Sequence, residues 1–86
     1  MNKFICIGHL GSEPEPIEKG CKLSLATEFW NGKEKKTIWL KVFVFGSSGE
    51  NCLNHLTKGR KIALEGRVDI TKAGNMCIIT DDVTFL

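Results

Sequence analysis

The sequence predicts an all-β domain, a five-stranded Greek-key barrel with one short helix between the third and fourth strands. Five segments are predicted to be strands, because the character of their side chains alternates with the period of two that is typical of a strand. One segment after Gly46 instead repeats its apolar residues at helical spacing. Turn-forming residues separate these segments, and a length of 86 residues predicts one domain over residues 1–86.

The first two expected strands are Lys3 to Leu10 and Cys21 to Trp30. The first has apolar residues on both faces, which predicts that neither face is freely solvated. The second places Trp30 on the face of Lys22 rather than among its aliphatic residues. Between the two strands, Gly11 to Gly20 contains two prolines and has a glycine at each end, so we expect a connecting loop without a regular element.

The third expected strand, Thr37 to Phe45, has the most strongly contrasted faces. One face, from Ile38 to Val44, is entirely aliphatic and should be buried. The other face carries three large aromatic side chains, with Lys41 set between them. A strand that only faced water would carry small polar or charged residues there. These aromatics therefore need either a second layer of protein or a ligand with flat faces, such as nucleobases.

A hairpin is expected between the second and third strands. Asn31-Gly32 is a strong turn signal, and the loop should extend to Lys36. The two strands would then pair antiparallel, with Trp30 and Trp39 flanking the same loop end. A cluster of lysines would lie above the two tryptophans: Lys33, Lys35 and Lys36.

The helix is expected after the third strand. Ser47 and Glu50 have the spacing of a capping box, and Gly59 after Lys58 is a typical C-terminal stop. The packing face of this helix would consist of Cys52, Leu53 and Leu56.

Two more strands follow, Lys61 to Ile70 and Met76 to Leu86, joined by a tight turn. Three strands, a helix and two strands is the order of the OB-fold, a Greek-key barrel. OB-folds bind oligonucleotides and oligosaccharides on the face of their second and third strands. Trp30 and Trp39 lie on those two strands, so the predicted fold and the candidate site agree.

Composition and spacing exclude several classes of site. The chain has four cysteines but no C-x-x-C pair, and each lies in or beside an apolar segment, so we expect buried thiols, no metal and no cofactor. No arrangement of nucleophile and base or of paired carboxylates points to catalysis, so an enzyme is not expected. Neither a secretory signal nor an apolar run of about 20 residues is present, which favours a cytoplasmic protein away from membranes.

The leading hypothesis is sequence-tolerant binding of single-stranded DNA. The net charge is only +2, so the phosphates would have to meet locally placed cations. RNA stays open as a ligand, because nothing in the sequence reads or excludes a 2′-hydroxyl. The expected base-stacking residues are Trp30, Trp39, Phe43 and Phe45, and the expected phosphate ligands are Lys22, Lys33, Lys35, Lys36, Lys41, Arg67 and Lys72.

Two alternatives remain at this point. Arg67 has Glu65 and Asp69 on its own face and could pair with them instead of a phosphate. The whole aromatic face could instead be buried against another subunit or another protein partner, with the same fold and no DNA.

Four segments in the same order resemble the first four strands of bacterial single-stranded DNA-binding proteins: MNKFICIGHLGSEPE, LSLATE, WLKVFVFG and KGRKIALEGRV. The resemblance implies an OB-fold that assembles into dimers or tetramers and acts in DNA replication, repair and recombination. It also implies roles for Trp30, Trp39 and Phe45, which stand where that family stacks aromatic side chains on DNA bases.

This sequence departs from the family pattern in three places. The segment from Ile70 to Met76 replaces a long basic hairpin that carries a further tryptophan. Leu40 stands where many members have a histidine used in assembly, so the interface between subunits is expected to differ. The acidic tail that recruits other enzymes is absent from these 86 residues. These features resemble a short form of the family or a tail-less relative, primosomal replication protein N, and make replication-restart proteins expected partners.

Overall fold

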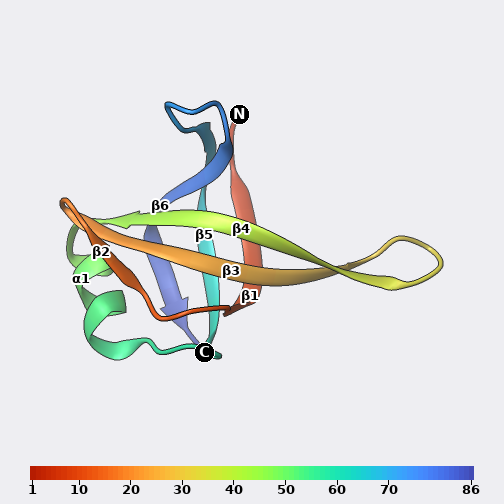
Figure 1. The fold of residues 1–86 in the computed structure, drawn as a ribbon, viewed down its shortest axis with the longest axis horizontal. Helices are drawn as coiled ribbons and strands as arrows, with labels where there is room; N and C mark the ends of the chain where they lie inside the picture. Colours follow the sequence, from red (N-terminus) through yellow and green to blue (C-terminus); the bar gives the residue numbers. More distant parts are fainter.

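In the computed structural model, which describes residues 1–86, the long strands close into a barrel (Figure 1). They follow one another in the order β1-β5-β6-β4-β3, and a short pairing of β1 with β3 closes the ring. This confirms the predicted five-stranded barrel with a helix between its third and fourth long strands. The barrel strands are β1 (Phe4–Leu10), β3 (Gly20–Trp30), β4 (Lys35–Phe45), β5 (Lys61–Ile70) and β6 (Met76–Phe85).

The core lies inside the barrel and is made by alternate residues of the strands, as their period of two predicts. Twelve buried residues form one cluster, and α1 (Gly46–His55) covers its end with Cys52. All four cysteines are free; Cys21, Cys52 and Cys77 are buried, as predicted, while Cys6 is half-buried. Burial and the adjacent thiol of Cys21 raise the pKa of Cys52 from 9.0 to about 12. No helix has the length and apolarity needed to cross a membrane.

A sixth strand, β2 (Glu15–Ile17), lies where a loop without regular structure was predicted. That prediction is wrong for these three residues, which pair antiparallel with the start of β3, Pro16 opposite Cys21. The proline is tolerated because β2 is a short strand at the edge of the sheet, where a missing N–H interrupts no further ladder. β2 therefore brings the β1–β3 connection alongside the barrel (Figure 1).

The predicted capping box is also wrong. α1 begins at Gly46, its N-cap residue is Phe45, and no side chain forms a capping hydrogen bond. The reason is that β4 runs directly into the helix, so the last strand residue takes the capping position. The hydroxyl of Ser48 instead donates to the Asp81 carbonyl of β6 at 2.6 Å.

The helix ends before the predicted stop at Gly59. Leu56 is already extended, and its N–H donates to the Cys52 carbonyl as the C-cap. Gly59 lies in the following loop with φ +91, where it donates its N–H to the Leu10 carbonyl at 2.8 Å. Its left-handed conformation thus joins the helix to β1 rather than ending the helix.

The β3–β4 hairpin is longer than predicted and projects beyond the barrel (Figure 1). Its loop starts at Asn31, whose side chain accepts hydrogen bonds from the Lys33 and Glu34 amides at 2.9 Å. β4 therefore begins at Lys35, inside the predicted loop. Because the hairpin leaves the barrel, Ile38 is 41% exposed although a buried position was predicted for it.

Candidate nucleic-acid interface

The outer face of the β3–β4 hairpin carries the predicted stacking residues in a line. Trp30 pairs with Lys35 next to the loop, whereas Trp39 lies further along, opposite Ala26. The prediction that both tryptophans flank the loop end is therefore wrong for Trp39. Four residues of strand separate the level of Trp30 from that of Trp39, a distance of roughly 13 Å at about 3.3 Å per residue.

The line continues past Trp39 with Phe43 and Phe45, which lie opposite Lys22 and Gly20. Trp30 is 67% exposed, Trp39 62% and Phe45 36%, while Phe43 is half-buried. None of the four belongs to the core cluster. The structure therefore presents the rings of Trp30, Trp39 and Phe45 on the surface, with Phe43 partly covered between Trp39 and Phe45.

The loop after β1 supports the middle of this line. The indole of Trp39 lies against Gly11, whose N–H donates to the Ser24 carbonyl at 2.8 Å. A hollow of about 290 Å³ adjoins the ring on the side of the free cation Lys41. Its lining is Ser12, Glu15, Lys22, Leu23, Ser24, Trp39, Leu40 and Lys41.

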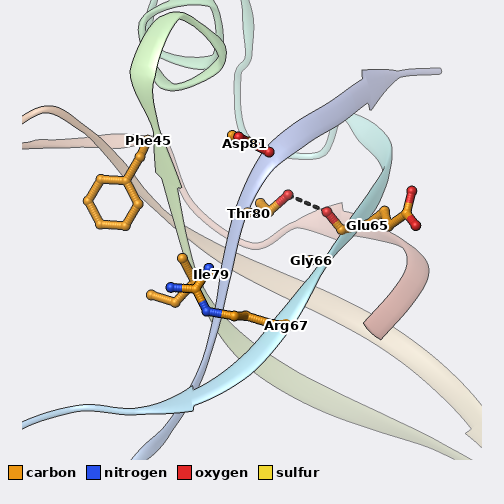
Figure 2. A pocket seen from close by; sticks show the side chains of 7 residues that line it. All are labelled: Phe45, Glu65, Gly66, Arg67, Ile79, Thr80 and Asp81. Carbon is orange, nitrogen blue, oxygen red and sulfur yellow. Dashed lines mark hydrogen bonds between the residues drawn. The ribbon is translucent and has the colours of Figure 1, made fainter. Parts of the chain in front are cut away.

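A row of side chains crosses the barrel from this face to β5. Phe43 pairs with Ile79 of β6, and Ile79 pairs with Arg67 of β5. Figure 2 shows the Arg67 side chain extending across Ile79, beside a hollow of about 500 Å³ that Phe45 also lines. The hollow lies at a bulge, where the register of β5 shifts between Glu65 and Arg67.

Four of the predicted phosphate ligands already have carboxylate partners. Arg67 lies 3.9 Å from Asp69, in agreement with the alternative that Arg67 pairs with a carboxylate on its own face. Glu65, the other carboxylate of that alternative, pairs instead with Lys3 at 2.6 Å. These pairs are exposed, and such pairs contribute only ~0–1 kcal/mol, so a phosphate can replace the carboxylate at small cost. The other pairs are Lys22 with Glu15 at 3.8 Å, Lys35 with Glu28 at 3.1 Å and Lys36 with Glu34 at 3.7 Å.

The remaining three predicted ligands have no ion-pair partner, but they do not form one cluster. Lys33 lies in the hairpin loop, Lys41 in the middle of β4 and Lys72 in the β5–β6 turn. In Figure 1 the hairpin loop and the β5–β6 turn are at widely separated ends of the molecule. The predicted cations are thus spread over several parts of the molecule, and Lys36, opposite Phe29, lies on the other face of the hairpin from the aromatic line.

Two residues of the candidate interface were missed from the sequence. Ile17 of β2 and Ile70 of β5 face a hollow of about 580 Å³ next to Phe43 and Phe45. Ile17 was missed because β2 was not predicted, although it is the one large apolar residue of its segment. Ile70 is 67% exposed because β5 continues beyond the core. The hollow is lined by Ile17, Glu18, Phe43, Phe45, Asp69, Ile70, Thr71, Lys72, Cys77 and Ile79.

Cys77 lies at the base of this hollow, with charged groups around it. Burial and the carboxylate of Asp69 raise the pKa of the Cys77 thiol, and the positive charges of Lys41 and Arg67 act in the opposite direction. The thiol is therefore held in its neutral form, and it adds apolar surface to the hollow.

Known proteins show the same fold and a related sequence. The model of the single-strand binding protein family matches residues 1–76. Single-stranded DNA-binding protein 1 of Chlorobaculum tepidum is 30% identical over 96% of this chain and 60% of its own length. Single-stranded DNA-binding proteins of Neisseria meningitidis are 34% identical over 84% of this chain and 47% of theirs. The chain thus spans about half the length of these relatives.

Two solved structures extend the comparison. The Plasmodium falciparum SSB in complex with single-stranded DNA has a TM-score of 0.80 and 26% identity, covering 100% of this chain and 95% of that one. The mitochondrial single-stranded DNA-binding protein Rim1 of S. cerevisiae shares the fold, with a TM-score of 0.75 and 22% identity over 98% of this chain and 91% of its own. The predicted OB-fold is confirmed, and the chain belongs to the single-strand binding protein family.

Proposed function

We propose that this chain binds single-stranded DNA with little sequence preference, as one OB-fold domain acting in DNA replication, repair or recombination. The observation that carries the proposal is the exposed line of aromatic side chains on the β3–β4 hairpin, headed by Trp30 and Trp39. Large exposed aromatics are unusual on a surface without a partner. The Plasmodium SSB, which has this fold, forms a complex with single-stranded DNA, and this supports the same class of ligand here.

In this proposal the bases stack on Trp30, Trp39, Phe43 and Phe45, and the phosphates meet the cations beside them. Each stacked base contributes about 1–3 kcal/mol and any base can stack, since every base has a flat face. Affinity falls as the salt concentration rises, and each phosphate contact makes the fall of log affinity with log salt concentration steeper by about 0.7. The cations with carboxylate partners exchange them for phosphates, whereas Lys33, Lys41 and Lys72 bind without such an exchange.

We also propose that the chain forms a homo-oligomer. β1 pairs with β3 only at His9 and Leu10, so most of that edge has no strand beside it. Next to this edge, Ile5 is 68% exposed and Ile7 54%. An open edge with apolar side chains can pair with the same edge of a second copy, which supports a dimer or a larger assembly.

Tryptophan fluorescence during titration with oligothymidylate at two salt concentrations tests the proposed function. The only tryptophans are Trp30 and Trp39, so their fluorescence reports on this face alone. We expect strong quenching by DNA and a lower affinity at the higher salt concentration. A folded protein whose fluorescence does not change at low salt would refute DNA binding here. The aromatic face would then be assigned to a protein interface, and the corresponding oligoribonucleotide decides whether RNA also binds.

A further inference from the structure

A second row of side chains leads away from Trp39 across the outside of the barrel. Trp39 pairs with Ala26 of β3, Ala26 with His9 of β1, and His9 with Lys61 of β5. Side chains of directly opposed residues lie on the same face, with Cβ atoms about 5 Å apart. Three steps between strands, at about 4.8 Å each, place the level of Lys61 roughly 14 Å from that of Trp39.

The side chain in the middle of this row is small. Ala26 contributes only a methyl group, and a hollow of about 240 Å³ lies beside it. Its polar lining includes His9, Lys61 and the ion pair of Glu28 with Lys35, and Ile7 of β1 borders it on the side of the open edge. The lysines therefore outnumber the carboxylate along this crossing. Between Trp39 and His9 a strand of DNA would pass over Ala26, and the His9 imidazole can donate a hydrogen bond to a phosphate.

At the far end of the row, Arg60 and Lys61 are exposed cations without a carboxylate partner. The backbone at Arg60 is held in place, since its carbonyl accepts a hydrogen bond from Leu10 and its N–H donates to Thr57. Most of the cations assigned to the aromatic line differ in this respect, because each has a carboxylate partner that it must leave before it binds a phosphate. Arg60 and Lys61 are thus ready to bind a polyanion, and they lie outside the set of residues assigned to the aromatic line.

We propose that single-stranded DNA extends from Trp39 across β3 and β1 to a second phosphate-binding site formed by Arg60 and Lys61, with His9 on the way. The inference rests on the proposed function and extends the course of the DNA on the protein surface. In Figure 1 β3 crosses over β1 at the base of the hairpin, and β5 is the strand that pairs with β1 on its other side. Short oligonucleotides fill the aromatic line alone, and longer ones also reach Arg60 and Lys61.

Lys61→Gln and the double variant R60Q/K61Q test this path with oligothymidylates of about 6 and about 30 nucleotides, one within and one well beyond the footprint of about 4–16 nucleotides for one OB-fold. With the long oligonucleotide, we expect weaker binding. We also expect the fall of log affinity with log salt concentration to be less steep by about 0.7 for each lost contact. With the short one, affinity and tryptophan quenching should equal those of the native chain. Lys3→Gln is the matched control, because it removes the same charge from the other end of β1, where Lys3 pairs with Glu65.

Each outcome has a definite meaning. A long-oligonucleotide slope that is unchanged in R60Q/K61Q, or lowered as much by Lys3→Gln as by Lys61→Gln, would overturn the path. In that case normal quenching by the short oligonucleotide would leave the aromatic site standing. If the native chain shows no quenching with either length, the proposed function and this inference fail together. A melting temperature close to that of the native chain confirms that each variant is folded.

Discussion

The indole of Trp39 lies on the backbone of Gly11 so closely that a methyl group at Gly11 would overlap its six-membered ring. The two residues are far apart in the chain, and the turn after β1 brings them together. Because Gly11 is tied to Ser24 of β3 through its N–H, it forms a fixed support under the ring. The absence of a side chain at Gly11 therefore decides where Trp39 can lie.

Gly11→Ala should displace the Trp39 ring and weaken oligothymidylate binding, by at most the ~1–3 kcal/mol that one stacked base contributes. Fluorescence titrations of Gly11→Ala, Trp39→Ala and the double variant measure this coupling. If Gly11 acts through the ring, its substitution should have almost no further effect once Trp39 is replaced. Equal losses in both backgrounds would show that Gly11 acts in another way.

Trp30→Ala should weaken binding of the same oligonucleotide by about 1–3 kcal/mol. Phe29→Ala is a matched control, because Phe29 is the adjacent aromatic on the opposite face of the hairpin and is 42% exposed. It should leave the affinity within error of the native value. A similar loss from both substitutions would point to disruption of the hairpin rather than to a stacking face.

Glu28→Gln should strengthen DNA binding at low salt, by up to about 1 kcal/mol, because Lys35 loses its carboxylate partner. The gain should shrink as salt screens the charges. Glu50→Gln makes the same change of charge on α1, at an exposed residue without an ion pair, and should have a smaller effect. An equal gain from both variants would attribute the effect to net charge instead of to Lys35.

Thr80→Val should destabilise the fold by about 1–3 kcal/mol, measured by urea unfolding. Thr80 is only 4% exposed; its hydroxyl donates to the Glu65 carbonyl (Figure 2) and accepts from the Asp82 N–H at 2.9 Å. Valine has nearly the same shape but removes the hydroxyl to which both groups bond. Thr84→Val, at an exposed position of β6, should change stability much less. Comparable losses would mean that the hydrogen bonds at the bulge contribute little.

Stability should fall as the pH rises above 9. The pKa of Cys52 is raised to about 12 in the folded state, so the unfolded chain loses this proton first. The stabilising contribution is complete below pH 9 and is lost between pH 9 and pH 12, at up to about 1.4 kcal/mol per pH unit. Urea unfolding in reducing buffer measures this slope. Cys52→Ala should begin less stable but decline less steeply, and parallel slopes would contradict the assignment to Cys52.

The sequence predicted the strands and the aromatic face well because both follow from alternation between neighbouring residues. Alternation tells which side of a strand a residue is on, but not whether anything covers that side. Ile38 shows the limit: it lies on the aliphatic side, yet it is exposed because the hairpin outruns the barrel. β2 was missed because Pro16 within it and Pro14 before it suggested a loop, whereas an edge strand accepts a proline.

Contacts between segments far apart in the chain could not be predicted from local sequence patterns. The pairing of Lys35 with Glu28 depends on where the hairpin loop begins, and the loop was predicted to be two residues longer. The row from Phe43 to Arg67 exists because β4 and β6 run parallel and adjacent, a neighbourhood that follows from barrel closure. Local patterns therefore predicted the residue types of the site, and topology decided their order.

Phe45 is the last residue of β4, the N-cap of α1 and the partner of Gly20 at the start of β3. An aromatic side chain at the surface is therefore attached to the backbone that starts the helix. Fraying of the first helical turn must move this ring, and a base resting on the ring must oppose that fraying by mass action. Under the proposed function, binding of a base at Phe45 would therefore be linked to hydrogen-exchange protection of the helix amides.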